Sequence, residues 1–186
     1  MDDNMIMDLY WERAESAITE TALKYGNYCL TIAMNILQSK EDSEECVNDT
    51  YLKMWNAIPP QRPTRFFAFL GRITRNLSIN RYRARNVQKR GGANIELILS
   101  ELEECIPSES SVEAEYEAGQ ISSVIDSFLA ASKPENRIIF VRRYWYADSI
   151  ASISERFGMS ESKVKSSLLR TRNKLKACLE NEGVTL

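Results

Sequence analysis

The sequence of 186 residues contains no histidine, and it has only four cysteines, seven glycines and five prolines. Without histidine the chain lacks the commonest general base and every Ser-His or Cys-His nucleophile pair, which argues against an enzyme. The four cysteines are scattered without a C-x-x-C pair, so we expect free thiols, no metal site and no cofactor. The scarcity of glycine and proline, with 44% hydrophobic residues, favours helical globular structure.

Long hydrophobic runs are also missing. The longest apolar runs span a few residues, far short of the ~20 that a membrane-spanning helix needs. The N-terminal stretch MDDNMIMDLYWERAE is acidic and has no apolar core of a secretory signal. We therefore expect a cytoplasmic protein that does not insert into a membrane.

Charge is strongly segregated along the chain, although the formal net charge is only -2. Residues 1–61 hold eleven acids and four bases, residues 62–90 nine bases and no acid, residues 91–118 eight glutamates and no base, and residues 119–186 eleven bases and seven acids. A uniformly solvated surface would mix the signs, so two basic blocks far apart in sequence suggest two contact points on one polyanion.

This segregation also suggests the domain organisation. The acidic block begins with a glycine pair and contains PSESS, which predicts a linker with at most a transient helix. We predict an all-α protein with two small helical domains, residues 1–90 and 119–186, joined by a flexible acidic linker over residues 91–118.

Three helices are predicted in the first domain. Apolar residues at helical spacing cover residues 10–38 and then residues 43–58, with Asp42 or Ser43 as the N-cap of the second helix. The prolines of PPQRPTR end that helix, and a third begins near Arg65 or Phe66. One apolar stripe of the third helix is expected to face the core: Phe66, Phe69, Leu70, Ile73 and Leu77.

A neighbouring face of the third helix is basic. Its arginines lack the glutamates that a solvated helix face uses for i,i+4 pairing: Arg65, Arg72, Arg75 and Arg83. Phosphate would relieve their mutual repulsion, and arginine suits bidentate contacts with phosphate or base edges. We predict nucleic acid as the partner of this face, with a membrane surface, an acidic protein or no partner at all as alternatives.

The second domain ends in the pattern of a helix-turn-helix. Ile150, Ile153 and Phe157 form the inner stripe of a short helix, Gly158 stands at its C′ position, and Ser160 can cap the following helix. The far side of that last helix is a polar strip between basic residues, which suits a major groove. A simple helical hairpin with a solvated outer face is the alternative.

Two stretches resemble a known family. EDSEECVNDTYLKMWNAI followed by FFAFLGRITRNLSINRYRAR resembles region two of bacterial sigma factors, and ENRIIFVRRYWYADSIASISERFGMSESKVKSSLLRTRNKL resembles their region four. The order, the spacing and the lack of a region-three domain match the small extracytoplasmic-function group, and the resemblance covers residues 22–179. It implies a protein that performs no catalysis, binds core RNA polymerase and directs promoter-specific initiation while helping to open the duplex.

The resemblance also assigns roles to residues. Glu45, Asn48, Asp49 and Lys53, which taken alone look like a solvated face, would meet the clamp helices of the beta-prime subunit. Region four would meet the beta flap, and an anti-sigma factor would be a further partner. The minus-ten element would be held by a loop and the third helix: Pro60, Gln61, Arg62, Thr64, Arg65, Arg72, Arg75, Asn76, Arg81 and Arg83. The minus-thirty-five element would be read by the last helix: Ser160, Ser162, Lys163, Lys165, Ser166, Leu169, Arg170, Arg172, Asn173 and Lys174.

Two positions depart from the family pattern. Asn80 stands where the family often has Asp, and Ser167 where an Arg often follows VKS, which removes an expected phosphate contact. Two rival functions are a helix-turn-helix regulator that binds duplex DNA alone and a nucleic-acid enzyme. The enzyme would need a carboxylate cluster for metal or a catalytic Ser or Tyr among basic residues, and residues 62–90 and 163–176 contain no Asp or Glu.

Overall fold

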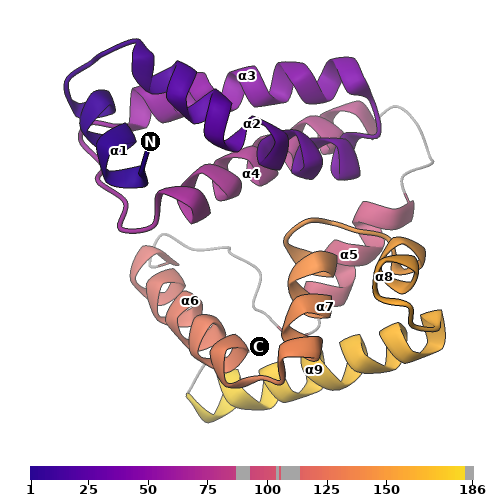
Figure 1. Cartoon of the computed structure of the whole chain (residues 1–186). Helices are drawn as coiled ribbons and strands as arrows, with labels where there is room; N and C mark the ends of the chain where they lie inside the picture. The colour runs from indigo at the N-terminus through magenta and orange to yellow at the C-terminus, as the bar shows by residue number, and fades with distance from the viewer. Residues whose placement is uncertain (87–92, 104, 106–113, 183–186) are drawn as a thin grey trace. The chain divides into compact units, whose positions relative to one another are not determined.

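The computed structural model describes residues 1–86, 93–103, 105 and 114–182, shown as a ribbon in Figure 1. This described part contains nine α-helices and no β-strand, which confirms the predicted all-α class. The chain divides into two compact units, Met1–Gly91 and Gly92–Leu186. None of the helices in the described ranges is both long enough and apolar enough to span a bilayer.

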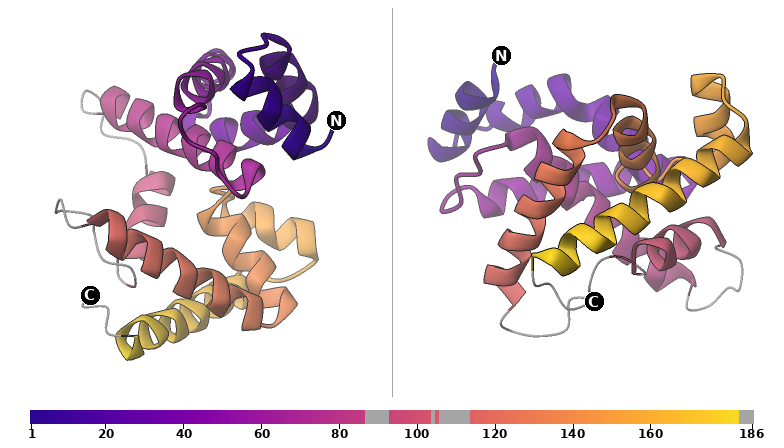
Figure 2. Two further views of the ribbon diagram at one scale, coloured as in Figure 1. Left: turned by 90° about the vertical axis from the view of Figure 1, so that its left-hand side faces the viewer. Right: turned by 90° about the horizontal axis from the view of Figure 1, so that it is seen from below.

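The first unit contains four helices: α1 (Asp3–Trp11), α2 (Ser16–Leu37), α3 (Lys40–Ala57) and α4 (Phe66–Asn86). The helices α2, α3 and α4 pack against one another, and α1 contacts both α2 and α4 (Figures 1 and 2). A single helix over residues 10–38 was the wrong prediction, because the chain breaks where Arg13 adopts a left-handed backbone with φ of 56°. Through Gly26 the helix α2 stays regular, and an added Cβ there would stand 3.4 Å from Tyr51 Oη of α3.

The start of α3 also differs from the prediction. Ser39 is the N-cap, and its hydroxyl accepts a hydrogen bond of 3.4 Å from the backbone N–H of Asp42. Glu41 and Asp42 therefore lie in the first turn, where acidic side chains stabilise the positive end of the helix dipole.

The buried face of α4 is partly polar. Phe66 and Leu70 are buried as predicted, but Thr74 and Ser78 continue the buried line. Their hydroxyls donate to the carbonyls one turn back, Thr74 to Leu70 at 3.0 Å and Ser78 to Thr74 at 2.8 Å, so no polar group is left unsatisfied there. The remaining members of the predicted apolar stripe, Phe69, Ile73 and Leu77, are only half-buried.

The second unit contains five helices: α5 (Ala93–Glu103), α6 (Ala114–Ala131), α7 (Pro134–Tyr144), α8 (Ile150–Phe157) and α9 (Glu161–Asn181). The helix α9 contacts α6, α7 and α8. The turn between α8 and α9 forms as predicted, with Gly158 in a left-handed conformation and Ser160 accepting from Lys163 N–H at 3.2 Å. Ile153, Val164 and Leu168 are buried inside this helix-turn-helix.

The helix α5 lies where a linker with at most a transient helix was predicted, and for these residues that prediction is wrong. Two of its side chains, Ile95 and Ile98, are 3% and 1% exposed, and α5 contacts α7. Burial of this apolar pair stabilises α5. The acidic composition of the segment had suggested a linker instead of a helix. Residues 114–118 of the predicted linker begin α6, and residues 91, 92, 104 and 106–113 lie outside the described residues.

Candidate nucleic-acid and partner interfaces

The outward face of α3 carries the residues predicted to bind polymerase. Glu45, Asn48 and Lys53 are exposed, and Asp49 is half-exposed. The structure adds Leu52, whose side chain is 59% exposed. At ~100° per residue, Leu52 falls between Asn48 and Asp49 around the helix, so an apolar residue stands amid polar ones, as at many protein interfaces. Its position outside the core stripe is the sequence signal that would have revealed it.

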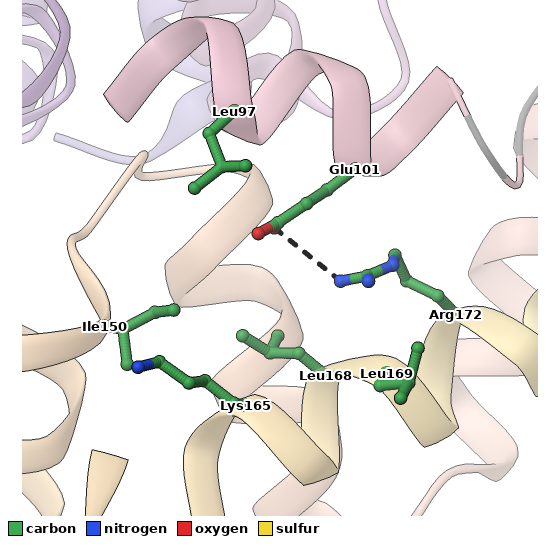
Figure 3. A pocket seen from close by; sticks show the side chains of 7 residues that line it. All are labelled: Leu97, Glu101, Ile150, Lys165, Leu168, Leu169 and Arg172. Carbon is green, nitrogen blue, oxygen red and sulfur yellow. Dashed lines mark ion pairs between the residues drawn. The ribbon is translucent and has the colours of Figure 1, made fainter. Parts of the chain in front are cut away.

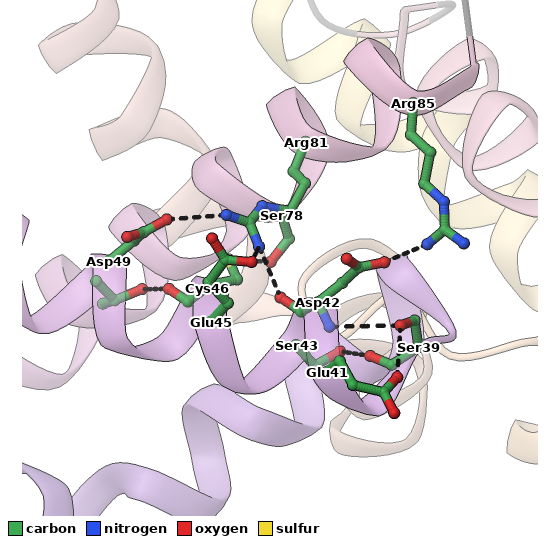
Figure 4. A network of polar contacts seen from close by, with 11 residues as sticks. Ser39, Glu41, Asp42, Ser43, Glu45, Cys46, Asp49, Ser78, Arg81 and Arg85 are labelled. Carbon is green, nitrogen blue, oxygen red and sulfur yellow. Dashed lines mark hydrogen bonds and ion pairs between the residues drawn. The ribbon is translucent and has the colours of Figure 1, made fainter. Parts of the chain in front are cut away.

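Arg81 of α4 points toward Glu45 and Asp49, the two carboxylates that form the acidic face of α3 (Figure 4). Its guanidinium lies 2.8 Å from Glu45 Oε2 and 3.1 Å from Asp49 Oδ2. One turn further along α4, Arg85 pairs with Asp42. Arg81 was predicted to hold promoter DNA, and in the structure its guanidinium pairs with two carboxylates of α3.

The exposed basic line of α4 is shorter than predicted. Arg72, Asn76 and Arg83 are exposed and fall within about 40° of arc at ~100° per residue. The Arg72 guanidinium lies 5.3 Å from the centroid of the Phe69 ring. Arg75 is half-buried, and burial lowers the pKa of its guanidinium.

The loop before α4 is held by α1. Arg62 forms an ion pair of 2.5 Å with Asp8 and lies 5.8 Å from the centroid of the Trp11 ring. Nothing in the sequence pattern predicted this contact, because it joins residues far apart in the chain. The other predicted loop residues are exposed: Pro60, Gln61, Thr64 and Arg65.

An aromatic ring stands exposed beside this loop. Phe67 is 41% exposed and stacks on Tyr28 with 4.1 Å between ring centroids, whereas Phe66 is only 2% exposed. Of the two adjacent phenylalanines, Phe67 is therefore the one that could stack on an unpaired base.

On α9 the predicted reading strip faces outward. Ser160, Ser162, Ser166 and Asn173 are exposed, and Leu169 is 50% exposed. Lys163, Arg170 and Lys174 line one exposed edge, where Lys163 also pairs with Glu135 of α7 at 2.7 Å. Ser167 is buried and donates to Asn136 Oδ1 at 2.9 Å, so position 167 faces α7 rather than the reading strip.

The opposite edge of α9 lies against α5. A cavity of about 320 Å³ separates α5 from the helix-turn-helix, and Figure 3 shows its lining: Leu97, Glu101, Ile150, Lys165, Leu168, Leu169 and Arg172. Lys165 is exposed and pairs with Glu161, but the Arg172 side chain is only 12% exposed and pairs with Glu101 at 3.6 Å. Arg172, predicted to contact the minus-thirty-five element, therefore faces α5.

Glu101 is the centre of a polar cluster between α5, α7 and α9. Its carboxylate accepts from Arg143 Nε and Nη2, both at 3.2 Å, and from Tyr144 Oη at 2.9 Å. The Arg143 side chain is 1% exposed, so its charge is compensated inside the unit rather than by water. Burial, ahead of the other contributions, raises the pKa of the Tyr144 phenol.

Two family models match the chain in this order: Sigma-70 region 2 over residues 22–87, and Sigma-70, region 4, over residues 133–175. Together they cover more than half of the chain. The chain belongs to the sigma-70 family. The pairing of these two regions places it in the extracytoplasmic-function subfamily, and its role is that of a sigma factor in transcription initiation.

Several solved structures are similar to this chain, among them CnrH. CnrH, solved in complex with the cytosolic domain of CnrY, has 21% sequence identity to this chain and a TM-score of 0.45, covering 96% of this chain and 97% of that one. No curated protein sequence matches the chain significantly.

The sigma-70 matches contain most of the surfaces described above. Region two spans the acidic face of α3 and the basic line of α4, and region four spans the helix-turn-helix. Both α1 and α5 lie outside the matched ranges, although α1 holds the loop before α4 and α5 contacts α7.

Metal-ligating side chains are not clustered in the described residues. These residues contain no group of three or more Cys, Asp or Glu side chains that could hold a metal ion. All four cysteines are free thiols, as predicted. Burial raises the pKa of Cys29 to about 11 and also raises the pKa of Cys46, so both stay protonated at neutral pH.

Proposed function

We propose that this sigma factor attaches to core RNA polymerase through the acidic face of α3 and confers promoter choice through α4 and α9. The observation that carries the proposal is the separation of two surfaces within one small unit. An acidic face with the exposed Leu52 lies on α3, and an exposed basic line lies on α4. In this proposal the clamp helices of the beta-prime subunit meet Glu45, Asn48, Asp49 and Lys53, and the beta flap meets region four.

The minus-ten element is assigned to the loop before α4 and the exposed line that follows it. Pro60, Gln61, Thr64 and Arg65 surround an extruded base, a geometry that lets a protein read an unpaired nucleotide. Arg72 and Arg83 then neutralise phosphates of the same strand, and Phe67 offers a stacking surface. Together these contacts would favour the open duplex over the closed one.

The minus-thirty-five element is assigned to α9 in the major groove. Ser162, Ser166 and Asn173 have donors and acceptors for base edges, and Leu169 offers apolar contact to a thymine methyl group. The exposed edge with Lys163, Arg170 and Lys174 supplies phosphate contacts.

The factor works in the cytoplasm, performs no chemistry, and lends specificity to the polymerase that does. An anti-sigma factor stays a prediction from the family resemblance.

Reconstituted transcription tests the proposed function. Core RNA polymerase with this protein is expected to produce transcripts from a defined subset of a genomic promoter library, and neither component alone should do so. The protein alone is expected to bind the same promoters only weakly. Tight, salt-sensitive binding to a duplex operator without any start-site choice would instead favour a helix-turn-helix regulator.

The double substitution Arg72→Ala with Arg83→Ala is expected to reduce open-complex formation at least tenfold while leaving polymerase binding intact. Loss of two single-strand phosphate contacts should also make the plot of log affinity against log salt shallower by about 1.4. A fluorescent base analogue in the minus-ten element measures both quantities. Arg156→Ala, which removes an exposed arginine of α8, is the control, and an unchanged open complex in the double variant would refute the assignment.

A further inference from the structure

The acidic face of α3 contains a like-charge pair that needs compensation. Glu45 and Asp49 are one helical turn apart, a spacing at which two negative charges repel and weaken a helix. Arg81 reaches across from α4 and places one guanidinium nitrogen on each carboxylate, at 2.8 Å and 3.1 Å (Figure 4). Its Nη1 also donates to the backbone carbonyl of Asp42 at 3.3 Å, which fixes the plane of the fork.

The two carboxylates nevertheless remain open to a partner. The Glu45 side chain is 66% exposed and that of Asp49 is 47% exposed, whereas the Arg81 side chain between them is only 26% exposed. One oxygen of each carboxylate accepts the hydrogen bond that Arg81 donates. Each acid therefore keeps lone pairs that can accept from a basic side chain approaching from solvent. The contact with Arg81 restricts the rotamers of both acid side chains.

From this arrangement we propose that Arg81 is a positioning residue of the polymerase-binding surface and not a contact to promoter DNA. The inference rests on the proposed function, in which Glu45 and Asp49 meet the polymerase. By holding both carboxylates before the partner arrives, Arg81 lowers the entropy lost on binding. Arg85, paired with Asp42, extends the same support one turn further along α4.

The same geometry separates Arg81 from the arginines assigned to DNA. A phosphate at this guanidinium would compete with two carboxylates that are already within hydrogen-bond distance. Arg72 and Arg83 are exposed on α4 and require no such exchange. The basic block of the sequence therefore serves two surfaces, with Arg81 and Arg85 supporting α3 and the exposed line facing nucleic acid.

A double-mutant cycle with core RNA polymerase tests this inference. In the full-length protein, Arg81→Ala is expected to weaken core binding by about tenfold, the scale set by two freed side chains. In a Glu45→Gln, Asp49→Asn background the same change should alter affinity less than twofold, because Arg81 acts only through those acids. Both carboxylates are open to water, and a like-charge pair at this spacing costs only about 0.5 kcal/mol, so the melting temperature should hardly change, which separates positioning from folding.

Three further variants define the outcomes. Asn80→Ala, an exposed neighbour of Arg81 on α4, is the control for core binding, and Arg81→Lys should restore part of the affinity. An Arg81→Ala effect that is equal in both backgrounds, or that appears only in open-complex formation, would overturn the inference. If Asp49→Lys abolishes core binding while Arg81→Ala does not, only the positioning role fails. If Asp49→Lys also binds normally, the proposed polymerase surface itself is wrong.

Discussion

The substitution Asp49→Lys is expected to weaken assembly with core RNA polymerase by at least about a hundredfold, since like charges facing each other across an interface cost several kcal/mol. The new lysine would stand beside Arg81, which now lies 3.1 Å from Asp49, and the pair would repel each other as well as a basic partner. Fluorescence anisotropy of labelled protein titrated with core enzyme measures the change. The effect should shrink as salt screens the charges.

A matched charge reversal on the same helix separates this effect from a general change of charge. Glu44→Lys introduces the same charge about 140° away from Asp49 around α3, at a residue whose own ion pair with Lys40 is weak and exposed. It should leave assembly within about threefold of the unmodified protein, because surface pairs contribute at most about 1 kcal/mol. Normal assembly by Asp49→Lys would show that the polymerase surface lies elsewhere, and the DNA assignments on α4 would need no change.

The parts of the fold that could be predicted are those set by local chemistry. The helix-turn-helix follows from Gly158, which takes the left-handed conformation easily, and from Ser160, whose hydroxyl caps the next helix. Both signals lie within a few residues of the structure they specify. The apolar stripe predicted for α4 was partly wrong, because a rule based on apolar spacing does not include Thr74 and Ser78. These two side chains can be buried because their hydroxyls donate to backbone carbonyls of the same helix.

The candidate sites were predictable as helix faces but not as sets of partners. The sequence pattern cannot distinguish the arginines of residues 62–90 from one another, because each is a positive charge in a block without acids. In the folded chain Arg62 meets Asp8 and Arg81 meets Glu45, over separations of 54 and 36 residues. Long-range pairs of this kind depend on how helices pack, which no local pattern encodes. The sequence pattern also did not predict α5, because glutamates on either side of its buried isoleucines suggested a linker.

The helix α5 carries Glu101, which pairs with Arg143 and Arg172. Glu101→Ala is expected to destabilise the docking of α5 by about 3 kcal/mol, the cost of leaving a buried charge without its partner. That figure applies because the Arg143 side chain is 1% exposed and the Glu101 side chain 14%, so water cannot replace the carboxylate as it does at a surface pair. Hydrogen exchange of the α5 amides in the full-length protein should become roughly a hundredfold faster.

Glu103→Ala provides the control, because Glu103 is an exposed acid on the same helix and its loss should change stability by less than about 0.5 kcal/mol. Glu101→Gln should fall between the two, since the amide oxygen still accepts a hydrogen bond but no longer neutralises Arg143. Equal exchange rates in Glu101→Ala and Glu103→Ala would show that the buried isoleucines alone hold α5. A selective loss of protection would show instead that one carboxylate ties α5 to α7, through the ion pair between Glu101 and Arg143.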